Sequence, residues 1–64
     1  MVKINGQPAE AAGKTVAQIV EEQGLNVQRV AVELNGDIVK RSDFDKVVVK
    51  EGDSMEIVNF VGGG

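Results

Sequence analysis

The chain has 64 residues, a net charge of −3, and neither cysteine nor histidine. This length predicts a single domain without room for a separate catalytic domain or an enclosed, drug-sized pocket. The missing residue types exclude disulfide bonds, zinc and thiolate metal sites, and the usual general base at neutral pH. No apolar run approaches the ~20 residues of a membrane span, and no signal-peptide pattern is present, so we expect a cytoplasmic protein.

The charged residues argue against a nucleic-acid partner, and we expect no membrane partner either. Seven basic residues are scattered among ten acidic ones, and only Lys40 and Arg41 are adjacent. No basic stripe is therefore available to follow a phosphate backbone. A protein partner with a basic docking surface is the natural expectation for this charge balance.

The N-terminal segment predicts a β-hairpin. Residues 1–4 alternate between apolar and polar side chains, as a half-buried strand does. Asn5-Gly6 is a strong signal for a type I′ turn, because both turn positions require positive φ. Residues 7–10 would form the returning strand, and Pro8 places that strand at a sheet edge because proline has no N–H for a strand ladder.

One helix of about three turns is predicted next. Thr15 and Gln18 have the spacing of a capping box, in which each side chain bonds the backbone N–H of the other residue. Gly24 is expected just beyond the helix end, with Leu25 packing back onto the helix. One apolar stripe should be buried, and it consists of Val16, Ile19 and Val20.

A second hairpin is predicted over residues 30–40. The first of its strands, residues 30–34, places three apolar side chains on one face: Val30, Val32 and Leu34. Asn35-Gly36 repeats the type I′ turn signal, and residues 37–40 would return.

The remaining residues predict a connection and a last strand. Residues 42–45 are typical of a loop or a short helical turn, with Phe44 as its core anchor. An extended stretch at residues 46–50 leads to a turn at 51–53, and the last strand should cover residues 54–61. The apolar stripes can be buried only if the helix packs on one face of the sheet. We therefore predict a two-layer α+β fold with a domain over residues 1–61 and a flexible glycine tail at 62–64.

The last strand should present two different faces. Met55 and Ile57 are predicted to point toward the helix, which leaves Val58 and Phe60 on the open face just before the tail. An exposed aromatic side chain there is the expected docking anchor for a partner, with Val61 beside it. The alternative is ordinary packing of Phe60 against neighbouring strands.

Three acidic side chains are expected to border this open face: Glu33, Asp53 and Glu56. No cleft is evident that would raise the pKa of a carboxyl group, so we do not expect a catalytic pair. They are either interface charges or a solvated surface.

The element order, the small size and the C-terminal glycines resemble the β-grasp fold of ubiquitin-like proteins, and most closely the ThiS family, the sulfur carriers of thiamine biosynthesis. The matching segments are VKING at residues 2–6, GKTV at 13–16, AVELNG at 31–36, EGD at 51–53 and IVNFVGGG at 57–64. Lys40 precedes Arg41 at a place where relatives often have a Pro-Arg pair.

The resemblance implies that the last glycine, Gly64, is adenylated and then converted into a thiocarboxylate, whose sulfur passes to thiazole synthase. It implies three partners: a ThiF-type adenylating enzyme, a sulfur donor fed by a cysteine desulfurase, and a ThiG-type thiazole synthase. The chain would be a carrier rather than an enzyme. It would bind no cofactor itself, since the adenylating partner consumes the ATP.

A glycine terminus suits that chemistry because no side chain hinders attack on the acyl carbon. Gly62 and Gly63 would thread into the partner's active site, since three extended residues reach about 10 Å and glycine has no Cβ. Three alternatives remain: a frayed terminus, the small subunit of molybdopterin synthase, and a non-covalent ubiquitin-like interaction module.

Overall fold

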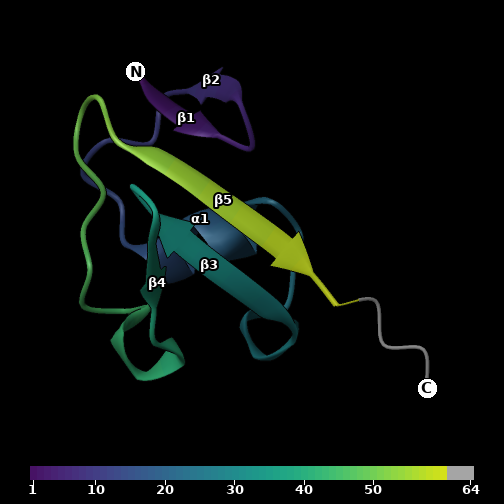
Figure 1. Ribbon diagram of the computed structural model, residues 1–64. Helices are drawn as coiled ribbons and strands as arrows, with labels where there is room; N and C mark the ends of the chain where they lie inside the picture. The colour runs from purple at the N-terminus through teal and green to yellow at the C-terminus, as the bar shows by residue number, and fades with distance from the viewer. Residues whose placement is uncertain (61–64) are drawn as a thin grey trace.

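The computed structural model describes residues 1–60 of the chain (Figure 1). The elements in chain order are β1 (Val2–Ile4), β2 (Gln7–Ala9), α1 (Val16–Glu22), the 3₁₀ helix η1 (Val27–Arg29), β3 (Val30–Leu34), β4 (Asp37–Val39), the 3₁₀ helix η2 (Arg41–Asp43) and β5 (Ser54–Asn59). The predicted α+β fold with one α-helix is confirmed.

The five strands form one mixed sheet in the order β2-β1-β5-β3-β4. β5 pairs in parallel with β1 and antiparallel with β3, and both hairpins lie to the outside. The predicted edge position of Pro8 is confirmed, because β2 is one of the two outer strands. The last strand is thus central and is held by both halves of the chain.

Both hairpin turns have the backbone geometry that the sequence predicts. Asn5 has φ 50° and Gly6 φ 82°, while Asn35 has φ 53° and Gly36 φ 87°. Positive φ at both turn positions is the type I′ geometry, whose twist matches that of the flanking strands.

The start of α1 is fixed by the predicted capping box. The backbone N–H of Gln18 donates to Thr15 Oγ1 at 3.1 Å, and Gln18 Oε1 accepts from the Thr15 N–H at 2.8 Å. Two of the amides at the start of the helix region thereby gain partners without tertiary contacts.

The end of α1 is also fixed locally. Gly24, at φ 78°, donates its N–H to the carbonyl oxygen of Glu21, and Leu25 donates to that of Val20. This pair of bonds is a Schellman motif. It leaves α1 with seven residues, about two turns. The prediction of about three turns was wrong because the two caps stand closer together than that length allows.

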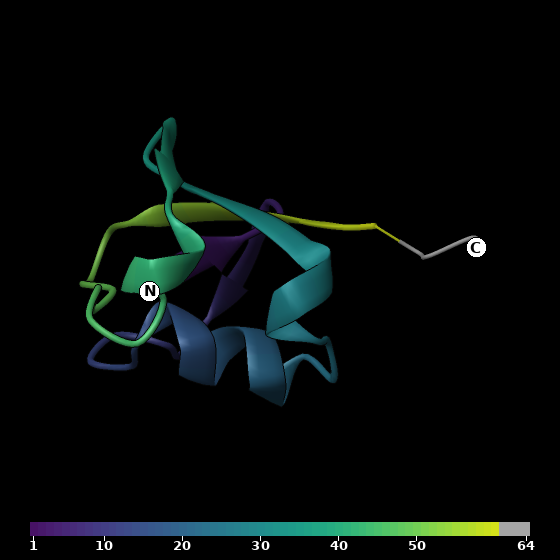
Figure 2. The ribbon, with the colours of Figure 1, turned by 90° about the horizontal axis from the view of Figure 1, so that it is seen from below.

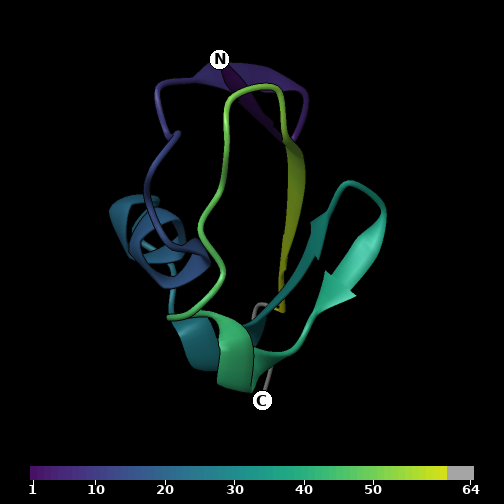
Figure 3. The same ribbon diagram turned by 90° about the vertical axis from the view of Figure 1, so that its left-hand side faces the viewer.

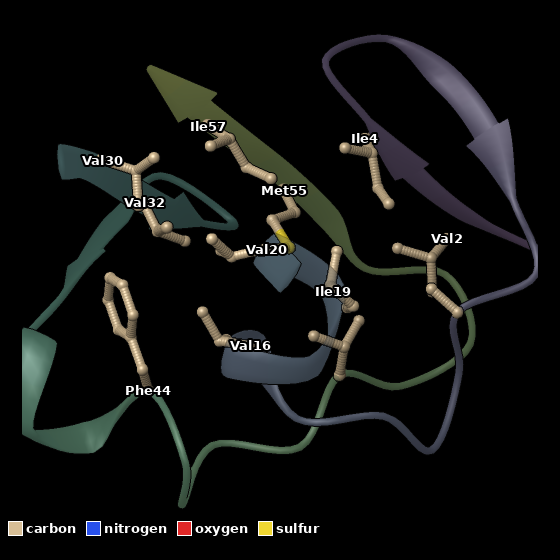
Figure 4. Close-up of a cluster of buried hydrophobic side chains, with 12 residues drawn as sticks. Val2, Ile4, Val16, Ile19, Val20, Val30, Val32, Phe44, Met55 and Ile57 are labelled. Atoms are coloured by element: carbon tan, nitrogen blue, oxygen red, sulfur yellow. The ribbon is translucent and has the colours of Figure 1, made fainter. Parts of the chain in front are cut away.

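The helix packs on one face of the sheet, as Figures 2 and 3 show. Its predicted stripe faces Met55 and Ile57 of β5 across the core (Figure 4). Phe44, only 4% exposed, closes one end of the core as predicted. The buried apolar residues are Val2, Ile4, Ala11, Val16, Ile19, Val20, Val30, Val32, Phe44, Val49, Met55 and Ile57.

The extended stretch at residues 46–50 lies outside the sheet. It runs beside the start of α1, where Thr15 and Val48 form an isolated β-bridge and Val49 donates to the carbonyl oxygen of Lys14 at 2.9 Å. Because Val49 is fully buried, this stretch closes the side of the core that the sheet leaves uncovered. Within residues 1–60, no helix is long and apolar enough to cross a membrane.

Candidate functional site

The last strand alternates between the core and the open face of the sheet. Met55 is fully buried and Ile57 is 7% exposed, whereas Val58 is 55% and Phe60 57% exposed. The predicted assignment of faces is therefore confirmed. β5 ends at Asn59 because β3 begins only at Val30, its partner across the ladder, so Phe60 follows the strand rather than belonging to it.

The register assembles a surface on the side away from α1. Val58 lies opposite Ala31, Glu56 lies opposite Glu33, and Glu33 lies opposite Ile38 of β4. We call this surface the open face, and its members are Ala31, Glu33, Ile38, Glu56, Val58 and Phe60. Ile38 is 77% exposed, the most of the large apolar side chains described. Sequence reasoning missed it, although its alternation with Val39 was a signal.

Glu33 and Glu56 form a like-charge pair across β3 and β5. Like charges directly opposite each other destabilise a sheet. The ion pairs among residues 1–60 lie elsewhere, between the N-terminal amine and Glu51 and between Lys14 and Glu22. The two carboxylates can therefore attract a cationic group of a partner.

Asp53 does not belong to this open face, contrary to expectation. Its carboxylate accepts hydrogen bonds from Asn35 Nδ2 at 3.0 Å and from the Lys50 N–H at 2.8 Å. The Asn35 amide, followed by the Lys50 N–H, holds the pKa of the Asp53 carboxyl below its ordinary value. Asp53 thus organises the turn that leads into β5.

The side chains of both turn asparagines, Asn5 and Asn35, form hydrogen bonds with the backbone of β5. Asn35 Oδ1 accepts from the Ser54 N–H at 2.9 Å, at the start of the strand. Asn5 Oδ1 accepts from the Ile57 N–H at 2.8 Å, and Asn5 Nδ2 donates to the Ile57 carbonyl oxygen at 3.3 Å. The sequence gives no signal for these contacts, because Asn5 and Ile57 are 52 residues apart.

The point at which the chain leaves the sheet is held by a second set of contacts. The Phe60 N–H donates to the carbonyl oxygen of Arg29 at 2.8 Å. Arg41 donates from Nε to the Val27 carbonyl oxygen at 2.9 Å and from Nη2 to that of Val30 at 2.8 Å.

Arg41 therefore joins η2 to the segment that carries Arg29. Its guanidinium carbon also lies 6.0 Å from the centroid of the Phe44 ring, within the range of a cation–π contact. Sequence reasoning noted Arg41 only for the lysine that precedes it, and missed this role.

The predicted reactive end of the chain lies outside the described residues. This applies to the modification site Gly64, to the threading residues Gly62 and Gly63, and to Val61 of the proposed docking set. Among residues 1–60, no three Asp or Glu side chains gather in an arrangement that could hold a metal ion. The described part of the candidate site therefore consists of the open face and of Asn59 and Phe60 at the end of β5, which we call the tail base.

Comparison with known proteins identifies relatives over the full length of the chain. The model of the ThiS family matches residues 2–64. A sulfur carrier protein ThiS from Thermus thermophilus is 34% identical over 64 residues, which is all of both chains. The crystal structure of the thiamine biosynthesis protein ThiS from Geobacter metallireducens is 34% identical, covers 98% of this chain and 97% of that one, and gives a TM-score of 0.79.

Two longer relatives are thiazole synthases. The protein from Paramagnetospirillum magneticum is 44% identical over 62 residues, and the protein from Magnetococcus marinus is 39% identical over 64 residues. The matched segments cover 95% and 98% of this chain but only 19% and 20% of those proteins. The chain therefore spans about a fifth of the length of these two relatives.

Proposed function

This chain belongs to the ThiS family, and from that premise we propose that the terminal carboxyl group of Gly64 carries sulfur as a thiocarboxylate. Members of the family are small sulfur carriers of thiamine biosynthesis and are not catalysts themselves. The observation that carries the proposal is that the family match extends to residue 64, so it includes the terminal glycine.

The proposed cycle begins with activation of the Gly64 carboxylate. One carboxylate oxygen attacks the α-phosphorus of ATP, and pyrophosphate leaves to give an acyl-adenylate. The outer sulfur of a persulfide on the donor, loaded by a cysteine desulfurase, then attacks the acyl carbon, and AMP leaves to give an acyl disulfide. A thiol of the partners attacks the donor's sulfur in that S–S bond, so the thiocarboxylate leaves and the thiol and the donor end as a disulfide. The partners supply ATP, sulfur and catalysis, and the setting is the cytoplasm.

The chain contributes an unhindered acyl carbon and a slender path to it. Glycine has no Cβ, so Gly62 and Gly63 allow close approach of a partner's backbone along the last residues. The span of three extended residues is about 10 Å, enough to pass from the domain surface into an active site. The folded domain provides the surface by which partners recognise the carrier.

We further propose that Val58 and Phe60, with Val61 following, dock the ThiF-type adenylating enzyme. The support is their position: both described side chains are more than half exposed and stand immediately before the tail. A ThiG-type thiazole synthase is the proposed sulfur acceptor, and the segments related to this chain within two thiazole synthases support it.

Mass spectrometry of the intact protein tests the proposal. The chain isolated from cells that contain the partners should include a species heavier by the exchange of one oxygen for one sulfur atom. A variant that lacks Gly64 should fold normally and show no such species. Sulfur transfer by that variant, or a wild-type chain without the heavier species, would overturn the carrier proposal.

Growth experiments distinguish thiamine synthesis from molybdopterin synthesis. A strain without this chain should need added thiamine, and the wild-type gene should remove that need while the Gly64-deleted gene should not. Loss of molybdenum-cofactor activity with normal growth in the absence of thiamine would favour the small subunit of molybdopterin synthase.

A further inference from the structure

We propose that the side-chain amide of Asn5 is a positioning group for the C-terminal tail, because it replaces the missing end of β1 and keeps β5 extended as far as the tail base. The inference rests on the proposed function, since the tail it positions is the one that partners would modify. Asn5 would act through β5 and would not touch the reacting atoms.

β5 continues beyond its neighbour on one edge. β1 pairs with β5 only at Lys3, opposite Ser54, and at Ile4, opposite Met55. β5 extends to Asn59, so residues 56–59 run past the end of β1. On that edge the strand has lost its main-chain partner just where it approaches the tail.

The hydrogen bonds on this edge follow a regular alternation. Lys3 donates to the carbonyl oxygen of Asp53 and Asn5 donates to that of Met55, each at 2.9 Å. The next residue of β5 on the same edge is Ile57, two positions further on. A longer β1 would offer Ile57 a carbonyl oxygen and an N–H.

Asn5 offers both groups from its side chain. Its Oδ1 accepts from the Ile57 N–H at 2.8 Å, and its Nδ2 donates to the Ile57 carbonyl oxygen at 3.3 Å. A primary amide carries the same acceptor and donor as a peptide group, so it can imitate one more step of the ladder. Only this orientation of the amide pairs a donor with an acceptor at both contacts.

The backbone after Ile4 cannot itself supply this acceptor and donor to Ile57. Asn5 and Gly6 have positive φ and turn the chain toward β2. Asparagine tolerates the left-handed conformation better than most residues, so one residue can form the turn and hold β5. On the opposite edge, the Arg29 carbonyl oxygen accepts from the Phe60 N–H, so β5 is held at Ile57 by Asn5 on one edge and at Phe60 by Arg29 on the other.

The hydrogen bonds between Asn5 and Ile57 matter for the proposed reaction because the proposed tail, residues 62–64, is short. If the end of β5 frays, only a fraction of the molecules present the tail base in the geometry that a partner binds. The apparent affinity falls in proportion to that fraction. The terminus that reacts in the complex is unchanged, so we expect the KM of adenylation to rise while kcat stays the same.

Asn5→Gly tests the inference, with Asn35→Gly as the matched control. Glycine preserves the positive φ of each turn and removes only the side-chain amide. Asn35 grips Ser54, at the far end of β5 from the tail. Both variants should lose some stability, so adenylation by a ThiF-type enzyme is measured by ATP–pyrophosphate exchange well below their melting midpoints.

We expect Asn5→Gly to raise KM for the carrier about tenfold, which corresponds to about 1.4 kcal/mol, with kcat unchanged. Asn35→Gly should leave KM near the wild-type value. Amide hydrogen exchange at Ile57 should be faster in Asn5→Gly than in wild type. Asn5→Asp, which keeps an acceptor for the Ile57 N–H, should partly restore protection and KM.

Three results would overturn the inference. Equal KM values for Asn5→Gly and Asn35→Gly, with normal wild-type activity, would overturn the role of Asn5 alone. Unchanged exchange at Ile57 in Asn5→Gly would show that the amide does not hold β5. Failure of the wild-type chain to be adenylated would overturn the proposed function, and this role of Asn5 with it.

Discussion

The Phe60 N–H donates a 2.8 Å hydrogen bond to the carbonyl oxygen of Arg29, while the Phe60 side chain is 57% exposed. The backbone of this residue is therefore fixed to the domain and its ring is left free. A substitution that removes only the ring keeps the backbone bond. A substitution of the Phe60 side chain can therefore change the affinity for a partner while leaving the free energy of unfolding nearly unchanged.

Phe60→Ala should weaken binding to the adenylating enzyme and barely shift the melting midpoint. Truncating an aromatic anchor at an interface typically costs about 2 kcal/mol or more, roughly thirtyfold in affinity. Calorimetry of binding and thermal denaturation on the same sample measure both effects. The control is Phe44→Ala, which removes a buried ring and should cost about 3–5 kcal/mol of folding stability.

The opposite result for Phe60→Ala would contradict the docking assignment. Unchanged affinity together with a stability loss near 3 kcal/mol, the scale of a core Phe→Ala substitution, would mean that the ring packs in the core. The docking surface would then lie elsewhere.

Glu33→Lys should stabilise the free protein and impair its association with a basic partner. The substitution turns the repulsion with Glu56 into attraction, and such cross-strand pairs contribute about 0.2–1 kcal/mol. The association rate should fall and depend less on salt, as expected when a charge at an interface rim is reversed. Urea melts and stopped-flow association measure the two effects.

Glu21→Lys is the control for net charge, because it makes the same change on the exposed surface of α1. If both variants slow association equally, overall charge rather than the open face governs the encounter.

Arg41→Lys should destabilise the protein although the charge is kept. A lysine ammonium cannot reproduce the planar fork that reaches the carbonyl oxygens of Val27 and Val30 together. Loss of one such bond should cost about 1–2 kcal/mol in the free energy of unfolding. Urea denaturation checks this, and Lys40→Arg beside it should be nearly neutral. Wild-type stability in Arg41→Lys would show that the fork contributes nothing.

The cap and the core stripe of α1 should differ in their contributions to stability. Thr15→Ala removes the capping oxygen and should cost about 0.5–2 kcal/mol. Ile19→Ala opens a cavity beneath the sheet and should cost about 2–5 kcal/mol. Urea melts that find the two substitutions equally damaging would contradict the assigned helix face.

Acid should remove the contribution of Asp53 to stability. The hydrogen bonds from Asn35 and Lys50 lower the pKa of the folded carboxyl below the ordinary value of 3.8. The contribution is therefore fully present above that ordinary pKa and is lost as the pH falls through the lower, folded pKa. Chemical denaturation across this acidic range should show the loss in wild type and a shallower dependence in Asp53→Asn. Identical pH profiles would exclude Asp53 as the cause.

The sequence by itself determined the local elements and motivated the proposed chemistry of the chain end. The two Asn-Gly turns, the capping box of Thr15 and Gln18, and the alternation along β5 each depend on residues a few positions apart. Local geometry and side-chain periodicity are therefore enough to predict them without knowledge of the tertiary contacts. The C-terminal glycines likewise belong to the sequence, and they carried the resemblance to sulfur carriers.

Only the tertiary structure decided how the base of the tail is held. Asn5 meets Ile57 across 52 positions of the chain, and Arg41 reaches carbonyl oxygens 14 and 11 positions away. The contact of Asn5 with Ile57 exists only because β5 is inserted between β1 and β3, and no periodicity along the chain encodes that strand order. The sequence identifies Asn5 only as a turn residue. In the folded protein its side-chain amide forms hydrogen bonds with the backbone of Ile57, as a neighbouring strand would.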